Sequence, residues 1–184
     1  MLGSKDEAPE LTRVVRVRTL PAGPVIIEAD ERERVALAQR FGIVSVDRLW
    51  ASVELELCKK GVRAEGSLSA TITQLCAVSD EAFQVPIEES IVLRFIEQGS
   101  ATLKPSDDED VDFDLTADDC DEIEYLGDSF DVGEAVAQTL GLAIDPYAEG
   151  PAADAARKSA GIVDEGSQAG PLAEGLAALK GSKT

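Results

Sequence analysis

Carboxylates are the side chains with which this chain could most readily do chemistry. Its 184 residues include 36 Asp and Glu against 17 Lys and Arg, so the formal net charge is −19, and histidine is absent. Without histidine, neither a Ser-His-Asp nor a Cys-His nucleophile system can be built. Acid–base catalysis would need Asp, Glu, Lys, Tyr or Cys. No pair of carboxylates stands out by its spacing, so we expect no catalytic residues; a carboxylate-dependent hydrolase is the least favoured alternative.

Most of the excess acid lies in one stretch of the chain. Residues 105–156 contain 17 Asp and Glu and no Lys or Arg. Such a stretch repels nucleic-acid phosphates and attracts basic proteins. The densest part predicts contacts with a basic partner through Asp107, Asp108, Glu109 and Asp110. The alternative is that residues 105–122 form a solvated loop whose charge only aids solubility.

The three cysteines do not predict a metal site or a disulfide framework. Cys58, Cys76 and Cys120 are odd in number and widely spaced, so we expect no metal and no cofactor. Cys76 is in phase with the apolar face of its strand, where a cysteine acts as a small hydrophobe. Gln74 shares that face. Its amide must therefore find hydrogen-bond partners, either as a satisfied core residue or in a functional role.

Two basic clusters form an alternative binding surface. They lie on an early strand and on a later hairpin, and their members are Arg13, Arg16, Arg18, Lys59, Lys60 and Arg63. These side chains could contact ribosomal RNA phosphates if the two elements are adjacent. The alternative is that the charges protect a sheet edge from aggregation. Aromatic residues do not alternate with the basic ones, as they do on platforms for single-stranded RNA.

Period-two alternation of apolar residues predicts an α+β fold built on an antiparallel sheet. The strands are expected near residues 12–19, 49–58, 61–75 and 87–97, in a sheet that is open or curled towards a barrel. Helices are expected near 31–41 and 131–143. Each begins with a capping box, formed by Asp30 with Glu33 and by Asp131 with Glu134. The pattern leaves open whether the second helix packs on the sheet.

The composition predicts one domain between two tails. Residues 1–10 are expected to form a disordered arm and residues 11–147 a single α+β domain with an acidic insert at 105–122. Residues 148–184 are expected to form a flexible tail with a short terminal helix. No apolar run approaches the roughly 20 residues of a membrane helix, and the polar N-terminus is unlike a signal peptide. We therefore expect a cytoplasmic protein that has no membrane partner.

The order of the motifs resembles that of the YceD family, also called large ribosomal RNA subunit accumulation proteins. A glycine-containing strand leads to a cysteine in "ASVELELCKKGVRAEGSLSATITQLC", which ends at Cys76. After "VPIEESIVLRF" and an acidic stretch, a Leu-rich helix and a proline-containing tail follow in "DSFDVGEAVAQTLGLAIDPYAEGP". The C-terminal "PLAEGLAALK" resembles the alphaproteobacterial version of the family. The positions that match or adjoin the pattern are Gly66, Gln74, Cys76, Asp131, Gly133 and Glu134.

The resemblance implies a non-catalytic role in the synthesis, processing or accumulation of large-subunit ribosomal RNA. The expected partner is a basic ribosomal protein or a precursor of the large subunit, and direct binding of ribosomal RNA is the alternative. The chain departs from the family in "CAVSDEAF", where Ser79 stands in place of the second cysteine of a Cys-x-x-Cys motif. A metal-bound motif of that kind needs two thiolates, so the departure argues against a metal or redox role for Cys76.

Overall fold

The computed structural model describes residues 10–99 and 121–162. The chain divides into two compact units, residues 1–74 with 84–145 and residues 75–83 with 146–184. The segment 75–83, inside the expected domain 11–147, thus belongs with the chain that follows residue 145. Residues 1–9 of the expected arm and the expected terminal helix lie outside the described residues, as do Asp107, Asp108, Glu109 and Asp110.

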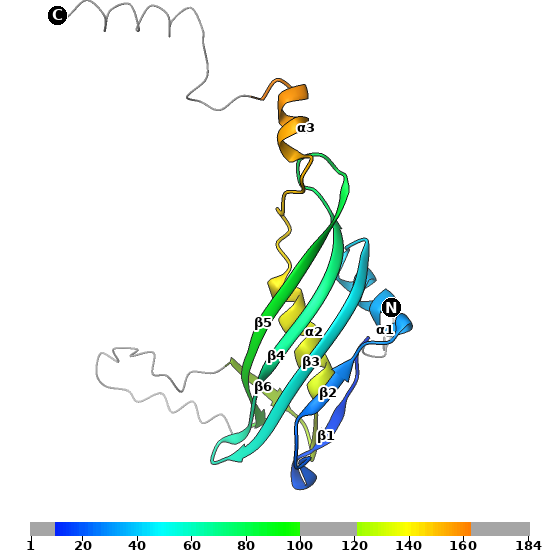
Figure 1. Ribbon diagram of the computed structural model, residues 1–184. Helices are drawn as coiled ribbons and strands as arrows, with labels where there is room; N and C mark the ends of the chain where they lie inside the picture. Colours follow the sequence, from blue (N-terminus) through cyan, green and yellow to red (C-terminus); the bar gives the residue numbers. More distant parts are fainter. Residues whose placement is uncertain (1–9, 100–120, 163–184) are drawn as a thin grey trace, which may run out of the picture. The chain divides into compact units, whose positions relative to one another are not determined.

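A five-stranded sheet forms the framework of the first unit (Figure 1). Its order is β2–β3–β4–β5–β6, and the strands are Val25–Glu28, Ser45–Cys58, Gly61–Leu75, Ala82–Glu97 and Asp121–Tyr125. The pairs β2–β3 and β3–β4 are antiparallel, whereas β5 and β6 are parallel. Because β2 and β6 end the order as edge strands, the sheet is open and not a barrel. The predicted α+β fold is confirmed.

The two long central strands have the alternation that the sequence predicts. In β4, Val62, Ala64 and Leu68 are buried, while Glu65 and Ser67 on the other face are exposed. The register places Ala51 opposite Leu68 and Glu54 opposite Glu65. Residues of like character therefore share a face across both strands, which is what buries one side of a sheet. These strands supply much of the hydrophobic core.

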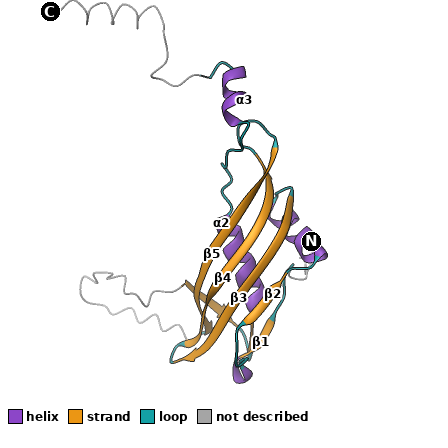
Figure 2. Ribbon diagram, in the orientation of Figure 1, coloured by secondary structure: helices purple, strands orange, loops and turns teal. Residues whose placement is uncertain are grey.

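Two helices of the first unit match the predicted ones. The helix α1 spans Glu31–Phe41; Asp30 and Glu33 form the expected capping box, and Gly42 ends the helix in the left-handed conformation with φ of 66°. The helix α2 spans Val132–Ala143 and lies across one face of the sheet (Figure 2). Its buried side chains Val132, Val136 and Leu140 join the core of the sheet, so the helix packs on the sheet.

The second expected capping box is not formed. The Asp131 side chain does cap α2, accepting hydrogen bonds from the backbone of Gly133 and Glu134. The Glu134 side chain does not return to the cap, because it hydrogen-bonds the guanidinium of Arg40 on α1. A long-range charged partner thus replaces the local one that the spacing predicts.

The expected strand over residues 12–19 is shorter than predicted. Only Val14–Arg16 forms a strand, β1, which pairs with β7, Ser129–Asp131, in a separate two-stranded sheet. The ladder ends after Arg16, opposite Ser129, where β7 begins. Residues Val17–Thr19 then form a 3₁₀ turn, η1, and the Val17 amide donates to the Asp128 carbonyl. The alternation of valines in the sequence cannot reveal that the partner strand is so short.

Several elements lie where the sequence gives little signal. Asp121 and Glu122, placed in a loop by their charge, begin β6, which pairs with Leu93–Glu97 of β5. Its Ile123 and Tyr125 pack against the core, which explains how so acidic a strand can form. Edge strand β2 and the short β7 were also not predicted. In the second unit, a seven-residue helix α3, Ala153–Ser159, lies within the expected flexible tail.

Candidate functional site

The "DVGE" stretch, residues 131–134, connects the start of α2 with the N-terminal segment and with α1. The Asp131 Oδ1 atom accepts hydrogen bonds from three backbone amides, those of Arg13 at 2.7 Å, Gly133 at 2.9 Å and Glu134 at 3.3 Å. The carboxylate therefore caps the helix and also fixes the backbone of the N-terminal segment. A negative charge at this end of a helix is favourable in itself.

Gly133 allows the N-terminal segment to pass close to the first turn of α2. A Cβ atom at this position would lie 2.6 Å from the Leu11 carbonyl oxygen and 2.8 Å from the Arg13 backbone nitrogen. Both are backbone atoms, which cannot rotate away as a side chain could. The glycine is therefore required by packing, a requirement that a sequence cannot show.

Two ion-pair networks surround this junction. Arg40 binds Glu134 through two hydrogen bonds of 2.8 Å and also contacts Glu10 at 3.0 Å. Arg13 binds both carboxylate oxygens of Glu33, at 2.6 and 3.1 Å. The hydrogen bond to Arg40 lowers the pKa of Glu134, and the hydrogen bond to Arg13 lowers the pKa of Glu33. The forked Arg40–Glu134 pair joins the end of α1 to the start of α2, and the Arg13–Glu33 pair joins the N-terminal segment to the start of α1.

The remaining first-unit motif residues also make specific packing contacts. A Cβ atom on Gly66 would lie 2.0 Å from the Ser52 carbonyl oxygen, so β3 and β4 could not approach as they do. Gln74 is only 6 % exposed, and its Nε2 donates to the Asp145 carbonyl at 3.2 Å. The amide thus finds a partner just beyond α2, as a satisfied core glutamine must.

Cys76 lies in the second unit, inside a tight turn. The chain reverses over Cys76–Glu81 with two backbone hydrogen bonds, and Asp80 takes a positive φ of 56°. Cys76 is 1 % exposed, and its sulfur accepts hydrogen bonds from the amides of Val78 and Ser79, each at 3.4 Å. The pKa of this thiol is lowered to about 7, chiefly by the hydrogen bond with the Ser79 hydroxyl. The backbone amides of Gly150, Ser79 and Val78 lower it further. Ser79 was not predicted as a functional residue, although the sequence pattern places it where a second cysteine would fall.

We expect the Cys76 thiol to titrate near pH 7 in the folded protein and nearer its ordinary value of 9 after unfolding. Because folding lowers this pKa, the thiolate stabilises the fold fully above pH 9, and that contribution is lost as the pH falls through 7. The ultraviolet absorbance of the thiolate measures the titration, in a chain whose Cys58 and Cys120 are replaced by serine.

The matched variant for this titration is Ser79→Ala, which removes the hydroxyl but keeps the backbone amide. The titration midpoint should then move upwards, towards the ordinary thiol value. A midpoint near pH 9 in the unchanged chain, or the same midpoint with and without the Ser79 hydroxyl, would contradict the hydrogen bonding described for the sulfur.

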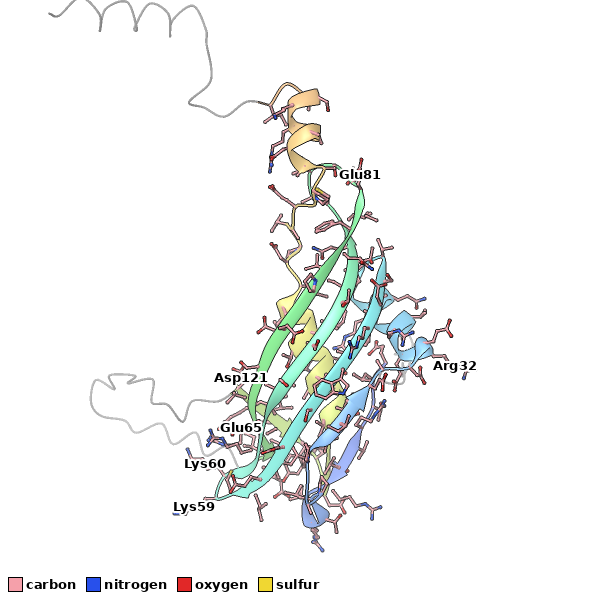
Figure 3. The ribbon with its side chains drawn as sticks, in the orientation of Figure 1. Arg32, Lys59, Lys60, Glu65, Glu81 and Asp121 are labelled. Carbon is pink, nitrogen blue, oxygen red and sulfur yellow. The ribbon has the colours of Figure 1, made fainter. Side chains whose placement is uncertain are left out.

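The six basic residues proposed as RNA contacts divide into two groups. Arg13 and Arg63 are occupied by carboxylates, Glu33 and Glu65 respectively. Among the described residues, the other four form no ion pair. Arg16 lies on β1 and Arg18 on η1. Lys59 and Lys60 occupy the turn between β3 and β4 (Figure 3). Of the six candidates, these four have a charge that no described carboxylate pairs and that could contact a phosphate.

Acidic residues are concentrated in the part of the first unit that comes later in the sequence. Residues 10–74, which form β1–β4 and α1, contain nine Asp and Glu and ten Lys and Arg. Residues 84–99 and 121–145, which form most of β5 and all of β6, β7 and α2, contain ten Asp and Glu and one Arg. Residues 100–120 connect β5 to β6 and add eight acids and one lysine. The excess negative charge thus belongs to residues 84–145, here called the acidic part of the first unit.

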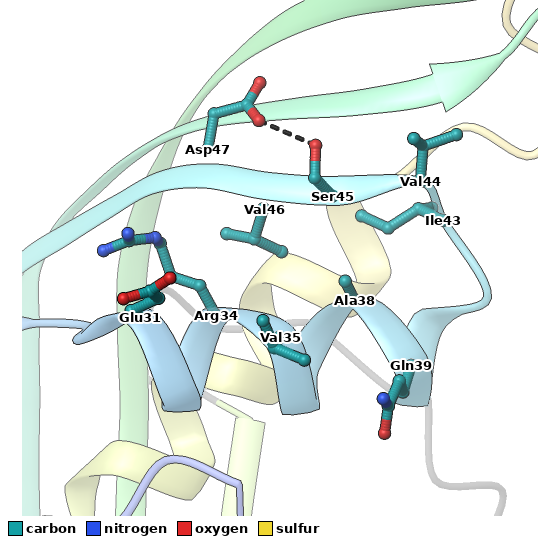
Figure 4. Close-up of a pocket in the computed structure, with 10 residues that line it drawn as sticks. All are labelled: Glu31, Arg34, Val35, Ala38, Gln39, Ile43, Val44, Ser45, Val46 and Asp47. Atoms are coloured by element: carbon teal, nitrogen blue, oxygen red, sulfur yellow. Dashed lines mark hydrogen bonds between the residues drawn. The ribbon is translucent and has the colours of Figure 1, made fainter.

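A pocket of about 440 Å³ lies between α1 and the first residues of β3 (Figure 4). Val35, Ala38 and Val46 supply apolar surface, and Glu31 and Arg34 lie at one end. Asp47 and Ser45 point away from α1. The pKa of Asp47 is lowered by hydrogen bonds, chiefly from the Ser45 hydroxyl and then from the Thr73 hydroxyl and the Gln84 amide. The volume suits a small molecule, but the charges on the wall are mixed and indicate no particular ligand.

Within residues 10–99 and 121–162, no group of three or more Cys, Asp or Glu is arranged to hold a metal ion. None of the helices in that part of the chain is both long and apolar enough to cross a membrane. No protein-family model, curated protein or solved structure matches the chain. The geometry therefore identifies a rigid, acidic framework whose motif residues position its helices.

Proposed function

We propose that this protein is a non-catalytic cytoplasmic factor that supports the accumulation of large-subunit ribosomal RNA. It does so by binding a basic ribosomal protein or a precursor of the large subunit. The observation that carries the proposal is the charge division of the first unit, in which residues 84–99 and 121–145 hold ten acids and one arginine. The resemblance of its motifs to the YceD family supports the ribosomal role.

The acidic part of the first unit acts mainly on the rate of encounter with the partner. An acidic surface attracts a basic protein over about 10 Å at moderate salt, and this attraction is screened as salt rises. Electrostatic steering of this kind raises association rates more than it raises affinity. Residues 100–120, which connect β5 to β6, add eight acids and one lysine to this charge.

Direct binding of ribosomal RNA is the second candidate, and one observation favours it. Arg16, Arg18, Lys59 and Lys60 are the basic candidates that form no ion pair with a described residue. Four phosphate contacts would give a salt-dependent affinity for RNA. Against it stands the overall charge of −19, which opposes the approach of any nucleic acid.

Depleting the protein in its host should lower large-subunit ribosomal RNA relative to small-subunit ribosomal RNA. Expression of the wild type should restore the ratio, whereas a variant with Asp107→Asn, Asp108→Asn, Glu109→Gln and Asp110→Asn should restore it only in part. The reason is that this variant loses four charges that attract the basic partner. Quantifying both RNAs from the same cells gives the ratio.

The matched control neutralises four exposed acids that lie outside the acidic part of the first unit, Glu28, Glu31, Glu54 and Glu56. It changes the net charge equally and should restore the ratio as well as the wild type does. An unchanged ratio after depletion would refute the ribosomal role. If both variants restore the ratio only in part, net charge and not the acidic segment is responsible. Loss of rescue by Lys59→Gln with Lys60→Gln alone would favour direct RNA binding.

A further inference from the structure

A small groove opens in the first unit beside the part of β5 that precedes its pairing with edge strand β6. The parallel pairing of the two strands begins with Asp121 opposite Leu93. Residues Glu89–Val92 of β5 therefore extend beyond the start of β6. The C-terminal turns of α2 border the same place through Thr139, Leu142 and Ala143, and the space between them has a volume of about 200 Å³.

The groove combines exposed apolar side chains with an acidic rim. Leu142 is 87 % exposed and Val92 is 48 % exposed, although α2 buries most of its other large apolar residues. Covering Leu142 with an apolar group would remove its side chain from water, which is favourable. The charged residues that line the groove are Glu89 and Asp121, and none of the lining residues is basic.

The dimensions and charge of the groove restrict its occupant. Its volume is below the roughly 300–1,000 Å³ of pockets that enclose a small molecule, so it suits an aliphatic side chain or two from a macromolecule. Nucleic acid and a second copy of this chain both bring negative charge to an acidic rim. Residues 107–119 of the chain itself, which are acidic, would meet the same repulsion.

We propose that this groove, the β5–α2 groove, receives a segment of a partner protein in which an aliphatic residue is flanked by lysine or arginine. The aliphatic side chain covers Leu142, and the flanking cations face Glu89 and Asp121. The inference rests on the proposed function for the basic character of the partner. It adds that recognition is amphipathic, so that charge alone does not determine binding.

The test uses the full chain and two synthetic peptides of equal length and charge. One alternates lysine with leucine, and the other alternates lysine with serine. The wild type should bind the lysine–leucine peptide on the order of tenfold more tightly, since about 1.4 kcal/mol of apolar burial corresponds to that factor. Leu142→Ser should abolish this preference. Glu89→Gln with Asp121→Asn should weaken binding of both peptides, more at low salt than at high salt.

The matched control is Leu126→Ser. Leu126 is 75 % exposed and lies after the far end of β6, five residues and about 16 Å along the strand from Asp121. The control should keep the full preference for the lysine–leucine peptide. Because both leucines are exposed, neither variant should unfold the protein, and a thermal melt of each variant verifies this.

Failure of the groove and failure of the proposed function give different results. If the wild type shows no preference for leucine, or Leu142→Ser keeps it, the groove proposal is overturned, whatever happens to ribosomal RNA after depletion. Loss of self-association in Leu142→Ser, with peptide binding unchanged, would assign the groove to a second copy and overturn the proposal as well. If the preference depends on Leu142 while depletion leaves the RNA ratio unchanged, the groove stands and the ribosomal role fails.

Discussion

Replacing Gly66 by alanine is expected to lower the free energy of unfolding by about 3 kcal/mol, at the upper end of the usual range for overpacking. A Cβ atom on this residue would lie 2.0 Å from the Ser52 carbonyl oxygen and 2.9 Å from the Val53 Cα atom. These atoms belong to β3, which pairs with β4 along its whole length. The strands must therefore separate locally, and core residues Val53 and Leu68 on either side lose packing.

Chemical denaturation followed by circular dichroism measures the Gly66→Ala loss, and Gly23→Ala is the matched control. Gly23 has no atom within 4 Å of its would-be Cβ and no positive φ. Its replacement should leave the stability unchanged or raise it slightly, because alanine restricts the unfolded chain. Equal effects of the two substitutions would show that the approach of β3 and β4 at Gly66 is not as close as the structure has it.

Replacing Asp131 by alanine is expected to cost about 2–3 kcal/mol, more than the loss of an ordinary helix cap. An ordinary cap serves the amides of its own helix, whereas Asp131 Oδ1 also accepts the Arg13 amide at 2.7 Å across the chain. Removing the carboxylate leaves that amide, in a partly buried site, without its acceptor. The pairing of Val14 with Asp131 in the β1–β7 ladder should then fray.

Two further variants separate the cap from the general effect of charge. Asp128→Ala removes an exposed carboxylate three residues earlier. The Val17 amide donates to the backbone carbonyl of Asp128, which the substitution keeps. Its stability should change little. Asp131→Asn keeps an oxygen acceptor and should lose less stability than Asp131→Ala. Amide hydrogen exchange at Arg13 gives a local readout, and unchanged protection there in Asp131→Ala would refute the tie between α2 and the N-terminal segment.

Local patterns in the sequence were enough to predict the main elements of the fold. The alternation over residues 49–58 and 61–75 predicts β3 and β4, because a side chain must point to one face or the other in an extended strand. The capping box at Asp30 and Glu33 predicts the start of α1, because those partners are three residues apart and depend on nothing else. The apolar stripe of residues 132–143 predicts α2 and its buried face for the same reason.

The patterns fail where a partner distant in the sequence decides the structure. Glu134 has the spacing of a capping box, but Arg40, 94 residues away, offers it two strong hydrogen bonds. Residues Asp121–Tyr125 have the composition of a loop, but β5 provides a parallel edge that makes them a strand. The shortness of β7 likewise limits β1 to three residues, although the valines of the segment continue to alternate.

The sequence by itself determined the fold class, the two long helices, the central strands and the concentration of acid after residue 104. These follow from periodicity, capping and composition, which act over a few residues. Only the tertiary structure decided why the motif residues are needed. Gly66 and Gly133 allow a neighbouring backbone segment to pack closely against them. Asp131 accepts a hydrogen bond from the distant Arg13 amide. Leu142 lies exposed beside Glu89 and Asp121. Such roles depend on which segments meet in space, and no local pattern encodes that.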